Sequence, residues 1–307
     1  HTHCEVLSVS RLGAFKGDFV GDKASRAASP FLIRVRDARS VERYHEADVV
    51  LDTTGSYSNP ASLGPGGMGA IGEDDVSDFI DYYTPDMEQV FARDYLGKRV
   101  LLVGSGYSAA TTLDGFRHQL EEHGEGSPQL DVLWAWRGAD ARQPYTLIPN
   151  DVLPQRAALA TFANTVARGD VDWVEPLPGK QVWMFAREPW SDGVRVFLKD
   201  LASNMSEEVV VDRVIANVGY RPDTDIYREL QVHLCYASEG PMKLAASLLA
   251  AGGGGGDRLA QESAGAEVLQ TPEPNFFVLG AKSYGRGSAF LIRLGLEQVE
   301  QVFELID

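Results

Sequence analysis

Cysteine is scarce in this chain, which excludes several ways of building and using a protein. The 307 residues include two cysteines, Cys4 and Cys235, which lie far apart and in no paired motif. This spacing excludes a disulfide scaffold and a Cys-x-x-Cys redox centre. His1 and His3 stand beside Cys4, but no further ligand lies at a spacing typical of zinc sites. We therefore expect no metal site, and the low cysteine content favours a cytoplasmic location.

Long apolar runs and positive charge are equally scarce. No run approaches the roughly 18 apolar residues that span a bilayer, and no basic-then-apolar leader is visible at the start. The chain has 28 Lys and Arg against 44 Asp and Glu, a formal net charge of -16. Such a surface repels nucleic-acid phosphates and anionic lipids. We expect a small-molecule substrate as the partner, no nucleic acid and no membrane, and a homo-oligomer stays open.

The length of the chain suits two domains or one large α/β domain. Residues Asn59 to Lys98 hold a loop rich in glycine and proline and an acidic stretch, which we interpret as an interdomain connection. Apolar patterns predict strands over Glu5–Val9, Phe31–Val35, Val41–Tyr44, Ala47–Asp52, Val171–Val174, Val182–Ala186, Val194–Leu198, Glu208–Val218 and Phe276–Leu279. They also predict a helix between Asn150 and Arg168 and another over Ser288–Leu305.

A strand-helix-strand unit occupies the middle of the chain. Arg99–Val103 is a continuous apolar strand, and Val132–Trp136 is the next one. The helix expected between them, Tyr107–Glu122, carries apolar residues at helical spacing on one face, namely Ala109, Leu113, Phe116 and Leu120. A turn of glycine, serine and proline ends this helix. The pattern is that of a βαβ unit with parallel strands.

The turn between the first strand and the helix has the form Gly-x-Gly-x-x-Ala. Gly104 permits a sharp turn, Gly106 lets the backbone approach a pyrophosphate, and Ala109 lets the helix pack closely on the strand. Free amides at the start of the helix would face the phosphates. We therefore predict a dinucleotide site made of Gly104, Ser105, Gly106, Tyr107, Ser108 and Ala109. The alternative is a plain strand-turn-helix with small residues.

The residue after the second strand indicates which dinucleotide binds. An acidic residue at this position would accept hydrogen bonds from the ribose hydroxyls of NAD. Here the residue is Arg137, whose guanidinium suits the 2′-phosphate of NADP, and Arg142 could assist it. This favours NADPH over NADH, with an ordinary surface arginine as the alternative.

Two further apolar strands, Val49–Gly55 and Val214–Tyr220, end in similar turns. Together with the Gly104 turn they give a chain that resembles the flavoproteins with two dinucleotide-binding domains, the group of thioredoxin-reductase-like enzymes and class B flavin monooxygenases. In that group such turns mark the crossings between the FAD and NADPH domains. The segment Phe276–Gly280 and the following helix resemble the last part of the FAD domain. The resemblance implies cofactor contacts at Thr54, Gly55, Gly219, Tyr220, Gly280 and Lys282.

The resemblance implies an α/β fold in which a Rossmann-like NADP-binding domain is inserted in an incomplete FAD/NAD(P)-binding domain. The expected parts are FAD-domain-like residues 1–58, a linker at 59–98, the NADP-binding domain at 99–218 and a second FAD-domain-like part at 219–307. The family's opening βαβ unit, which holds the FAD pyrophosphate, is not in this sequence. We therefore expect FAD as a cofactor if that unit is supplied.

Two other departures concern the chemistry. The family's usual Gly-Asp after the last strand is replaced by Gly280-Ala281-Lys282, and Lys282 and Arg286 would add positive charge beside a flavin. Surface charge is the alternative interpretation. The region Gly69 to Asp86 has no histidine, unlike the linker motif of class B monooxygenases, which puts monooxygenation in doubt.

These observations lead to a functional expectation with two alternatives. We expect an NADPH-dependent flavoprotein oxidoreductase that passes hydride from NADPH to FAD, with monooxygenation left open. The first alternative is a non-catalytic NADP(H)-binding module or sensor derived from such an enzyme. The second is a flavin-free dehydrogenase, although no catalytic His or Lys-Tyr arrangement is evident. No catalytic residue is assigned from the sequence.

Overall fold

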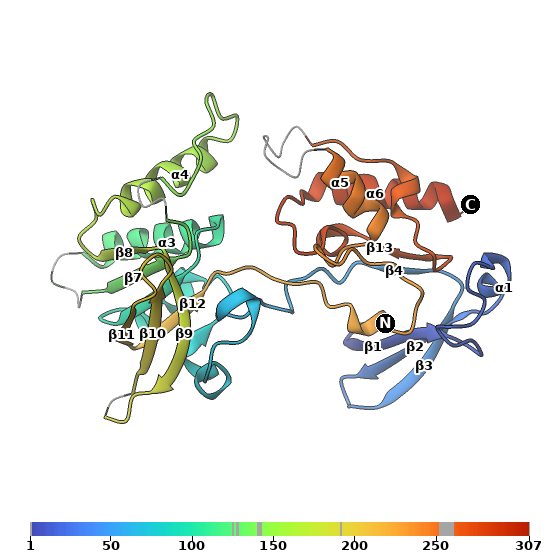
Figure 1. Ribbon diagram of the computed structural model, residues 1–307, viewed down its shortest axis with the longest axis horizontal. Helices are drawn as coiled ribbons and strands as arrows, with labels where there is room; N and C mark the ends of the chain where they lie inside the picture. Colours follow the sequence, from blue (N-terminus) through green and yellow to red (C-terminus); the bar gives the residue numbers. More distant parts are fainter. Residues whose placement is uncertain are drawn as a thin grey trace. The chain divides into compact units, whose positions relative to one another are not determined.

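The computed structural model describes residues 2–124, 126, 129–139, 143–190, 192–251 and 261–306. The chain forms two compact units, which can be followed by colour in Figure 1. Unit 1 combines residues 1–59 with 220–307, and unit 2 comprises residues 60–219. Unit 2 is thus an insertion in the sequence of unit 1, and the chain passes from one to the other at 59–60 and 219–220.

Unit 2 is built on a parallel sheet. The strand order is β5–β12–β6–β7–β8, with bounds Ile80–Asp81, Arg213–Ala216, Arg99–Val103, Asp131–Trp136 and Val174–Pro178. Strands β6 and β7 confirm the two strands of the predicted βαβ unit, and helix α3 (Tyr107–His123) confirms the helix between them. Near-continuous apolar sequences in β6 and β7 are what a sheet covered on both faces requires.

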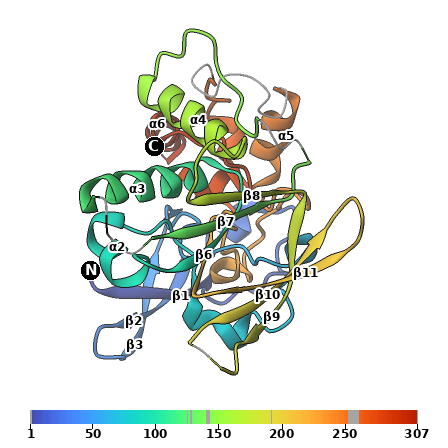
Figure 2. The same ribbon diagram turned by 90° about the vertical axis from the view of Figure 1, so that its left-hand side faces the viewer.

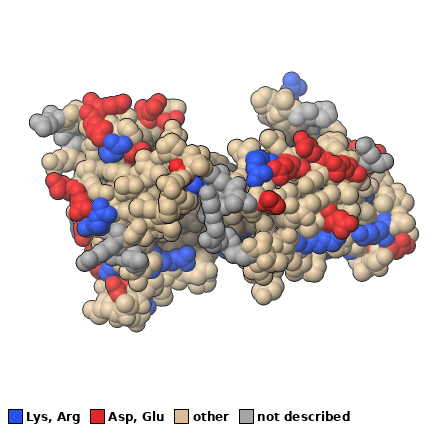
Figure 3. Space-filling model, turned by 90° about the horizontal axis from the view of Figure 1, so that it is seen from above, with Lys and Arg blue, Asp and Glu red and all other residues tan. Residues whose placement is uncertain are grey.

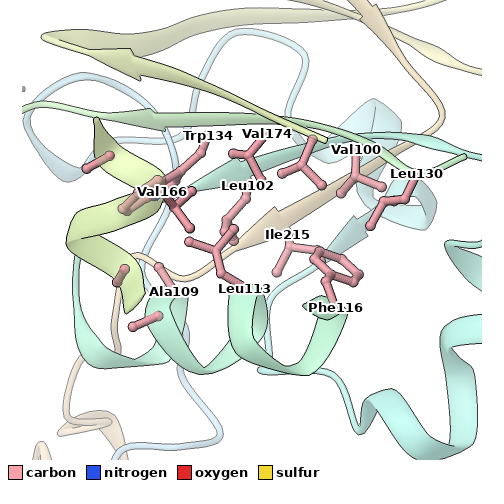
Figure 4. Close-up of a cluster of buried hydrophobic side chains, with 14 of the residues drawn as sticks. Val100, Leu102, Ala109, Leu113, Phe116, Leu130, Trp134, Val166, Val174 and Ile215 are labelled. Atoms are coloured by element: carbon pink, nitrogen blue, oxygen red, sulfur yellow. The ribbon is translucent and has the colours of Figure 1, made fainter. Parts of the chain in front are cut away.

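Helices cover one face of this sheet. They are α2 (Met87–Asp94), α3 and α4 (Pro154–Ala167), and Figure 2 shows α3 and α4 on the same side of β6, β7 and β8. In Figure 4 the side chains of Leu102 and Ile215 from the sheet face those of Leu113 and Phe116 from α3. All four are fully buried, and each contributes about 1.5–3 kcal/mol through removal of apolar surface from water.

An antiparallel sheet covers the other face. Its strand order is β11–β10–β9, with bounds Ser206–Val211, Val194–Asp200 and Lys180–Arg187, and its apolar side chains pack on Leu101, Leu133 and Val214 of the parallel sheet. The prediction of one strand over Glu208–Val218 was wrong, because β11 and β12 belong to different sheets. They separate at Asp212, whose amide donates to Arg99 O and whose carboxylate accepts from Arg99 N.

The stretch expected to be an interdomain connection belongs to unit 2. It contains the 3₁₀ helices η1 (Pro65–Gly67) and η2 (Asp74–Phe79), strand β5 and helix α2. Its order comes from a buried carboxylate, Glu73, which accepts hydrogen bonds from Leu63 N (3.1 Å), Ala70 N (2.7 Å) and Tyr82 Oη (2.9 Å). The hydrophobic pattern of this stretch gave no sign of the Glu73 network, because the network is made largely by backbone amides of loops.

Unit 1 has fewer residues in helices and strands than unit 2. Its antiparallel sheet has the order β1–β2–β3, with bounds Cys4–Arg11, Phe31–Asp37 and Glu42–Ala47, and its parallel pair joins β4 (Val50–Asp52) to β13 (Phe276–Val278). The helices are α1 (Lys23–Ala27), α5 (Met242–Ala250) and α6 (Ile292–Ile306), with short 3₁₀ turns η3 (Asp225–Tyr227), η5 (Ala266–Leu269) and η6 (Gly280–Tyr284).

A buried ionic triad holds the N-terminal part of unit 1 to the segment before β13. Glu273 accepts from Arg11 Nε at 2.8 Å and from Arg26 Nε at 2.9 Å, and all three residues are at most 4% exposed. Burial lowers the pKa of Arg11, against the opposing influence of the Glu273 carboxylate. The Glu273 carboxylate also accepts from Gln231 N at 2.7 Å. Because each charge has several partners, the cost of removing it from water is offset.

The surface carries charged side chains of both signs (Figure 3). On the face seen in Figure 3, acidic and basic side chains are interspersed. Among the described residues, no helix has both the length and the apolar content needed to cross a bilayer.

Candidate functional site

The predicted phosphate turn lies at the carboxyl edge of the parallel sheet in unit 2. Strand β6 ends at Val103, and α3 begins four residues later at Tyr107. The chain continues from β6 to β7 on one side, while β12 pairs with β6 on the other side. The strand order therefore reverses at β6. Open α/β sheets bind ligands outside the carboxyl ends of their strands at such a switch point.

Gly104 makes the sharp bend that leaves the sheet. Its φ is +124°, which L side chains rarely adopt, and a Cβ here would lie 2.2 Å from Asn217 O. Its amide donates to Ala135 O at 2.9 Å, and its carbonyl accepts from Trp134 Nε1 at 2.7 Å. A residue with a side chain would therefore have to displace the backbone that follows β12.

Gly106 has a different role, because its backbone needs no glycine. It is the N-cap of α3 with φ −82° and ψ 174°, and a Cβ here would meet nothing within 4 Å. The flanking residues Ser105, Tyr107 and Ser108 are exposed. Among the described residues, no side chain caps this first turn, and its first residues include no acid. The positive end of a 17-residue helix is thus open to an anion from solvent.

Close packing fixes the helix over the strand. Ala109 and Ala110 are fully buried, so α3 meets the sheet without an intervening side chain. Thr112 Oγ1 donates to Asn217 Oδ1 at 2.8 Å, and both residues are buried. This bond joins α3 to the segment after β12. The two residues that this bond joins lie 105 positions apart in the sequence.

Aromatic residues that the sequence did not single out support the turn. Tyr145 Oη donates to Gly106 O at 2.8 Å, and the Tyr145 ring lies edge to face with Tyr107 at 5.6 Å between centroids. Burial raises the pKa of Tyr145, so it stays a neutral donor. Trp134 lies 6.4 Å from Tyr145 in a stacked arrangement. Tyr145 lies in a loop 39 residues from Gly106, so no local sequence motif could have found it.

Arg137 lies where the sequence places it, directly after β7, and it is exposed. Among the described residues, no carboxylate forms an ion pair with it. Its guanidinium is therefore available to a ligand phosphate. Arg142, named as its assistant, lies outside the described residues.

In unit 1 the strand-end turn after β4 is held by Asp52. The carboxylate of Asp52 accepts from Thr54 N at 3.1 Å and from Thr54 Oγ1 at 2.7 Å. Thr54 itself is exposed, and Gly55 has φ +69° with open space beside its Cα. The Asp52 side chain of this turn is therefore buried, while Thr54 and the space beside Gly55 Cα are open to solvent.

The positive charge expected from Lys282 and Arg286 beside a flavin is neutralised within the protein. Lys282 is fully buried, and its Nζ lies 2.7 Å from Asp52 Oδ2 and 3.1 Å from Thr54 Oγ1. Arg286 pairs with Glu239 at 2.6 Å. Lys282 thus finds its counter-ion inside unit 1, which the sequence spacing did not reveal, whereas Arg286 is paired at the surface.

The start of the last helix also differs from the expectation. Helix α6 begins at Ile292 and not at Ser288. Gly280 (φ +70°) donates its amide to Gln298 Oε1 at 2.7 Å, and Gln298 Nε2 donates to Ser283 Oγ at 3.0 Å. A buried glutamine of α6 therefore organises the turn after β13.

The remaining predicted residues lie at the second crossing. Gly219 has φ +92° and accepts from Ala61 N at 2.9 Å. Tyr220 contacts Tyr57, with ring centroids 4.8 Å apart. The two crossing segments are thus paired in each unit.

No protein-family model matches this sequence, and no curated protein matches it. Solved structures do resemble the fold. The chain superposes on bacillithiol disulfide reductase from Bacillus cereus with a TM-score of 0.63 at 15% identity, covering 99% of this chain and 70% of that one. Thioredoxin reductase from T. acidophilum gives 0.58 at 16% identity, with coverage of 99% and 74%. The ornithine N-hydroxylase of Kutzneria sp. 744 gives 0.60 at 13% identity, with coverage of 98% and 71%.

At these identities the comparison establishes the fold. The chain shares the α/β fold of these solved structures, with a Rossmann-like unit, as the resemblance in the sequence implied. The structures it resembles include both disulfide reductases and an N-hydroxylase, so the fold alone does not select a reaction.

Proposed function

We propose that this protein is an NADPH-dependent flavoprotein oxidoreductase whose nucleotide binds at Gly104–Ala109. The observation that carries the proposal is the uncovered start of α3 at the reversal point of the parallel sheet. Gly104 fits the bend and Gly106 leaves room above the helix, so backbone amides could grip a pyrophosphate. The fold shared with flavin-dependent oxidoreductases supports the same reading.

The preference for NADPH rests on Arg137. An exposed guanidinium at the end of β7, without an ion-pair partner among the described residues, offers two donors to a 2′-phosphate. In an Arg137→Gln variant we expect the affinity for NADPH to fall by roughly 10- to 150-fold, because one charge-assisted contact is worth about 1.5–3 kcal/mol. The affinity for NADH should change little.

Several residues of unit 1 fit an FAD site. Thr54 is exposed, and Gly55 and Gly280 present positive-φ backbone with open space beside the Cα, which suits close approach of a cofactor. Bound FAD would supply the redox chemistry, as the acceptor of hydride from the nicotinamide. Lys282 would act through its ion pair with Asp52, which fixes the Thr54 turn, and not by direct contact.

A non-catalytic NADP(H)-binding module is the second candidate. It is favoured by the turn after β13, where the Lys282 ammonium and the Gly280 amide are both engaged inside the protein. These two groups would then be unavailable to a flavin. This candidate predicts nucleotide binding without FAD binding and without turnover.

One set of titrations distinguishes these functions. The purified protein is titrated with NADPH, NADH and FAD by calorimetry, and NADPH oxidation is then followed by absorbance after FAD is added. Binding of both cofactors with NADPH oxidation supports the oxidoreductase. Nucleotide binding alone supports the module, and no heat from either nucleotide refutes both.

A further inference from the structure

Trp136, the last residue of β7, has a buried indole N–H that finds no acceptor within the part of the chain that the structure describes. The residue is 2% exposed, and its Nε1 has no hydrogen-bond partner among the described residues. Its neighbour Trp134 contrasts with it, because Trp134 Nε1 donates to Gly104 O at 2.7 Å. Buried polar groups in folded proteins are nearly always paired, so an orphaned donor points to a partner that binds later.

This indole N–H lies at the carboxyl end of β7, directly before Arg137. A Cβ built on Gly138 would lie 3.4 Å from Trp136 Cδ1 and 3.7 Å from its Nε1. The polar edge of the indole therefore lies beneath the exposed turn at Gly138, which adds no side chain over it, and a ligand reaches the buried Nε1 only when this turn moves aside. The centroids of the Trp136 and Trp134 rings lie 4.4 Å apart. Because Trp134 donates to Gly104 O, only this one ring separates Trp136 from the phosphate turn.

The chemistry of the group restricts what could bind it. An indole N–H is a donor only, so its partner must be an acceptor. The neighbouring guanidinium favours an anionic acceptor, because hydrogen bonds to charged oxygens are the strong ones. In this fold the end of the second strand is where the adenosine ribose of a dinucleotide lies, and its 2′-phosphate is the anionic acceptor there.

We propose that Trp136 Nε1–H donates, beside the Arg137 guanidinium, to the 2′-phosphate of the bound nucleotide. This inference rests on the proposed nucleotide site. It assigns the preference of that site for a phosphorylated ribose to Trp136 and Arg137, two consecutive residues at the end of β7. The three oxygens of a phosphate can accept from both donors at once. A ribose without the phosphate gives the indole no anionic partner.

The test compares wild-type protein with Trp136→Phe, which keeps an aromatic ring and removes the donor. The probes are NADPH, NADH, 2′,5′-ADP and 5′-ADP, titrated by calorimetry. We expect the affinity for NADPH and for 2′,5′-ADP to fall about tenfold, while NADH and 5′-ADP stay within about twofold. The melting temperature of the free protein should fall modestly, because the smaller ring leaves part of a buried site empty and the removal of an unsatisfied donor offsets some of that loss.

Two matched variants separate specificity from structure. Gly138→Ala keeps the indole N–H but adds a methyl group beside it, and it should weaken the same two phosphorylated ligands. Trp134→Phe removes the bond to Gly104 O and should weaken NADPH and NADH alike, because it alters the pyrophosphate turn.

The outcomes are distinguishable from those of the proposed function. An equal loss for NADPH and NADH in Trp136→Phe, or no loss for either, overturns the assignment of Trp136. If wild-type protein binds neither nucleotide, the proposed function itself fails. Should Trp136→Phe not fold, the indole N–H proton resonance of wild-type protein serves instead. It should move downfield with 2′,5′-ADP and not with 5′-ADP, and equal responses overturn the proposal.

Discussion

The two glycines of the phosphate turn should respond in opposite ways to an added side chain. Gly106 has an extended backbone and open space around its Cα, whereas Gly104 has φ +124° and lies against Asn217 O. A Gly106→Val substitution should therefore leave the fold intact and obstruct the nucleotide. A Gly104→Ala substitution should instead damage the fold of unit 2.

The magnitudes follow from local terms. At Gly106, valine loses about 1 kcal/mol of capping preference and regains about 0.4–1 kcal/mol because it restricts the unfolded chain. The free energy of unfolding should thus change by less than about 1 kcal/mol. At Gly104, a positive φ costs alanine about 1–2 kcal/mol, and overpacking against a backbone oxygen 2.2 Å away costs about 1–3 kcal/mol more.

Thermal unfolding and NADPH titration check both substitutions. A loss of about 3 kcal/mol should lower the melting temperature of Gly104→Ala by roughly 6–12 °C, on the scale for domains of this size. Gly106→Val should melt within about 4 °C of wild type and bind NADPH at least about 100-fold more weakly, a loss of about 2.7 kcal/mol. If Gly106→Val binds NADPH as tightly as wild type, the turn is not the nucleotide site. If Gly104→Ala is as stable as wild type, the packing argument is wrong.

Three further predictions concern buried or paired charges. Glu273→Gln should destabilise unit 1 by about 3–5 kcal/mol in denaturant melts, because it leaves two buried arginines without their carboxylate. Lys282→Met should cost a similar amount by stranding Asp52, and the double variant with Asp52→Asn should recover most of it; an additive loss would contradict the pairing. Hydrogen bonds, first from the Ser203 amide, lower the pKa of Asp200 from 3.8 to about 2. Its contribution is therefore present above about pH 4 and lost as the pH falls towards 2, so Asp200→Asn should flatten this part of an acid-unfolding curve.

Local features of the site could be predicted from the sequence. The order strand, Gly104-x-Gly106, helix is encoded by neighbouring residues, so the turn and both flanking elements are where the pattern placed them. Arg137 likewise follows directly from the end of β7. Such features need only the alternation of apolar residues and the conformational freedom of glycine.

Boundaries that depend on competing partners were not predictable in this way. Residues 206–216 look like one β-rich run, yet β11 and β12 join different sheets because different strands lie beside them. The stretch 60–98 lacks regular patterns, and its order depends on the Glu73 carboxylate and the loop amides that it collects. Propensity cannot choose between partners that are distant in sequence.

The sequence by itself determined that unit 2 contains a βαβ unit with a glycine turn suited to a dinucleotide. Only the tertiary structure decided what stands around that turn: Asn217 against Gly104, Tyr145 on Gly106, and the indole of Trp136, which has no partner among the described residues, next to Arg137. It likewise turned Lys282 inward to Asp52. The physical reason is range, because a backbone bend is set by adjacent residues whereas a buried polar group is satisfied by whichever strand the fold brings beside it.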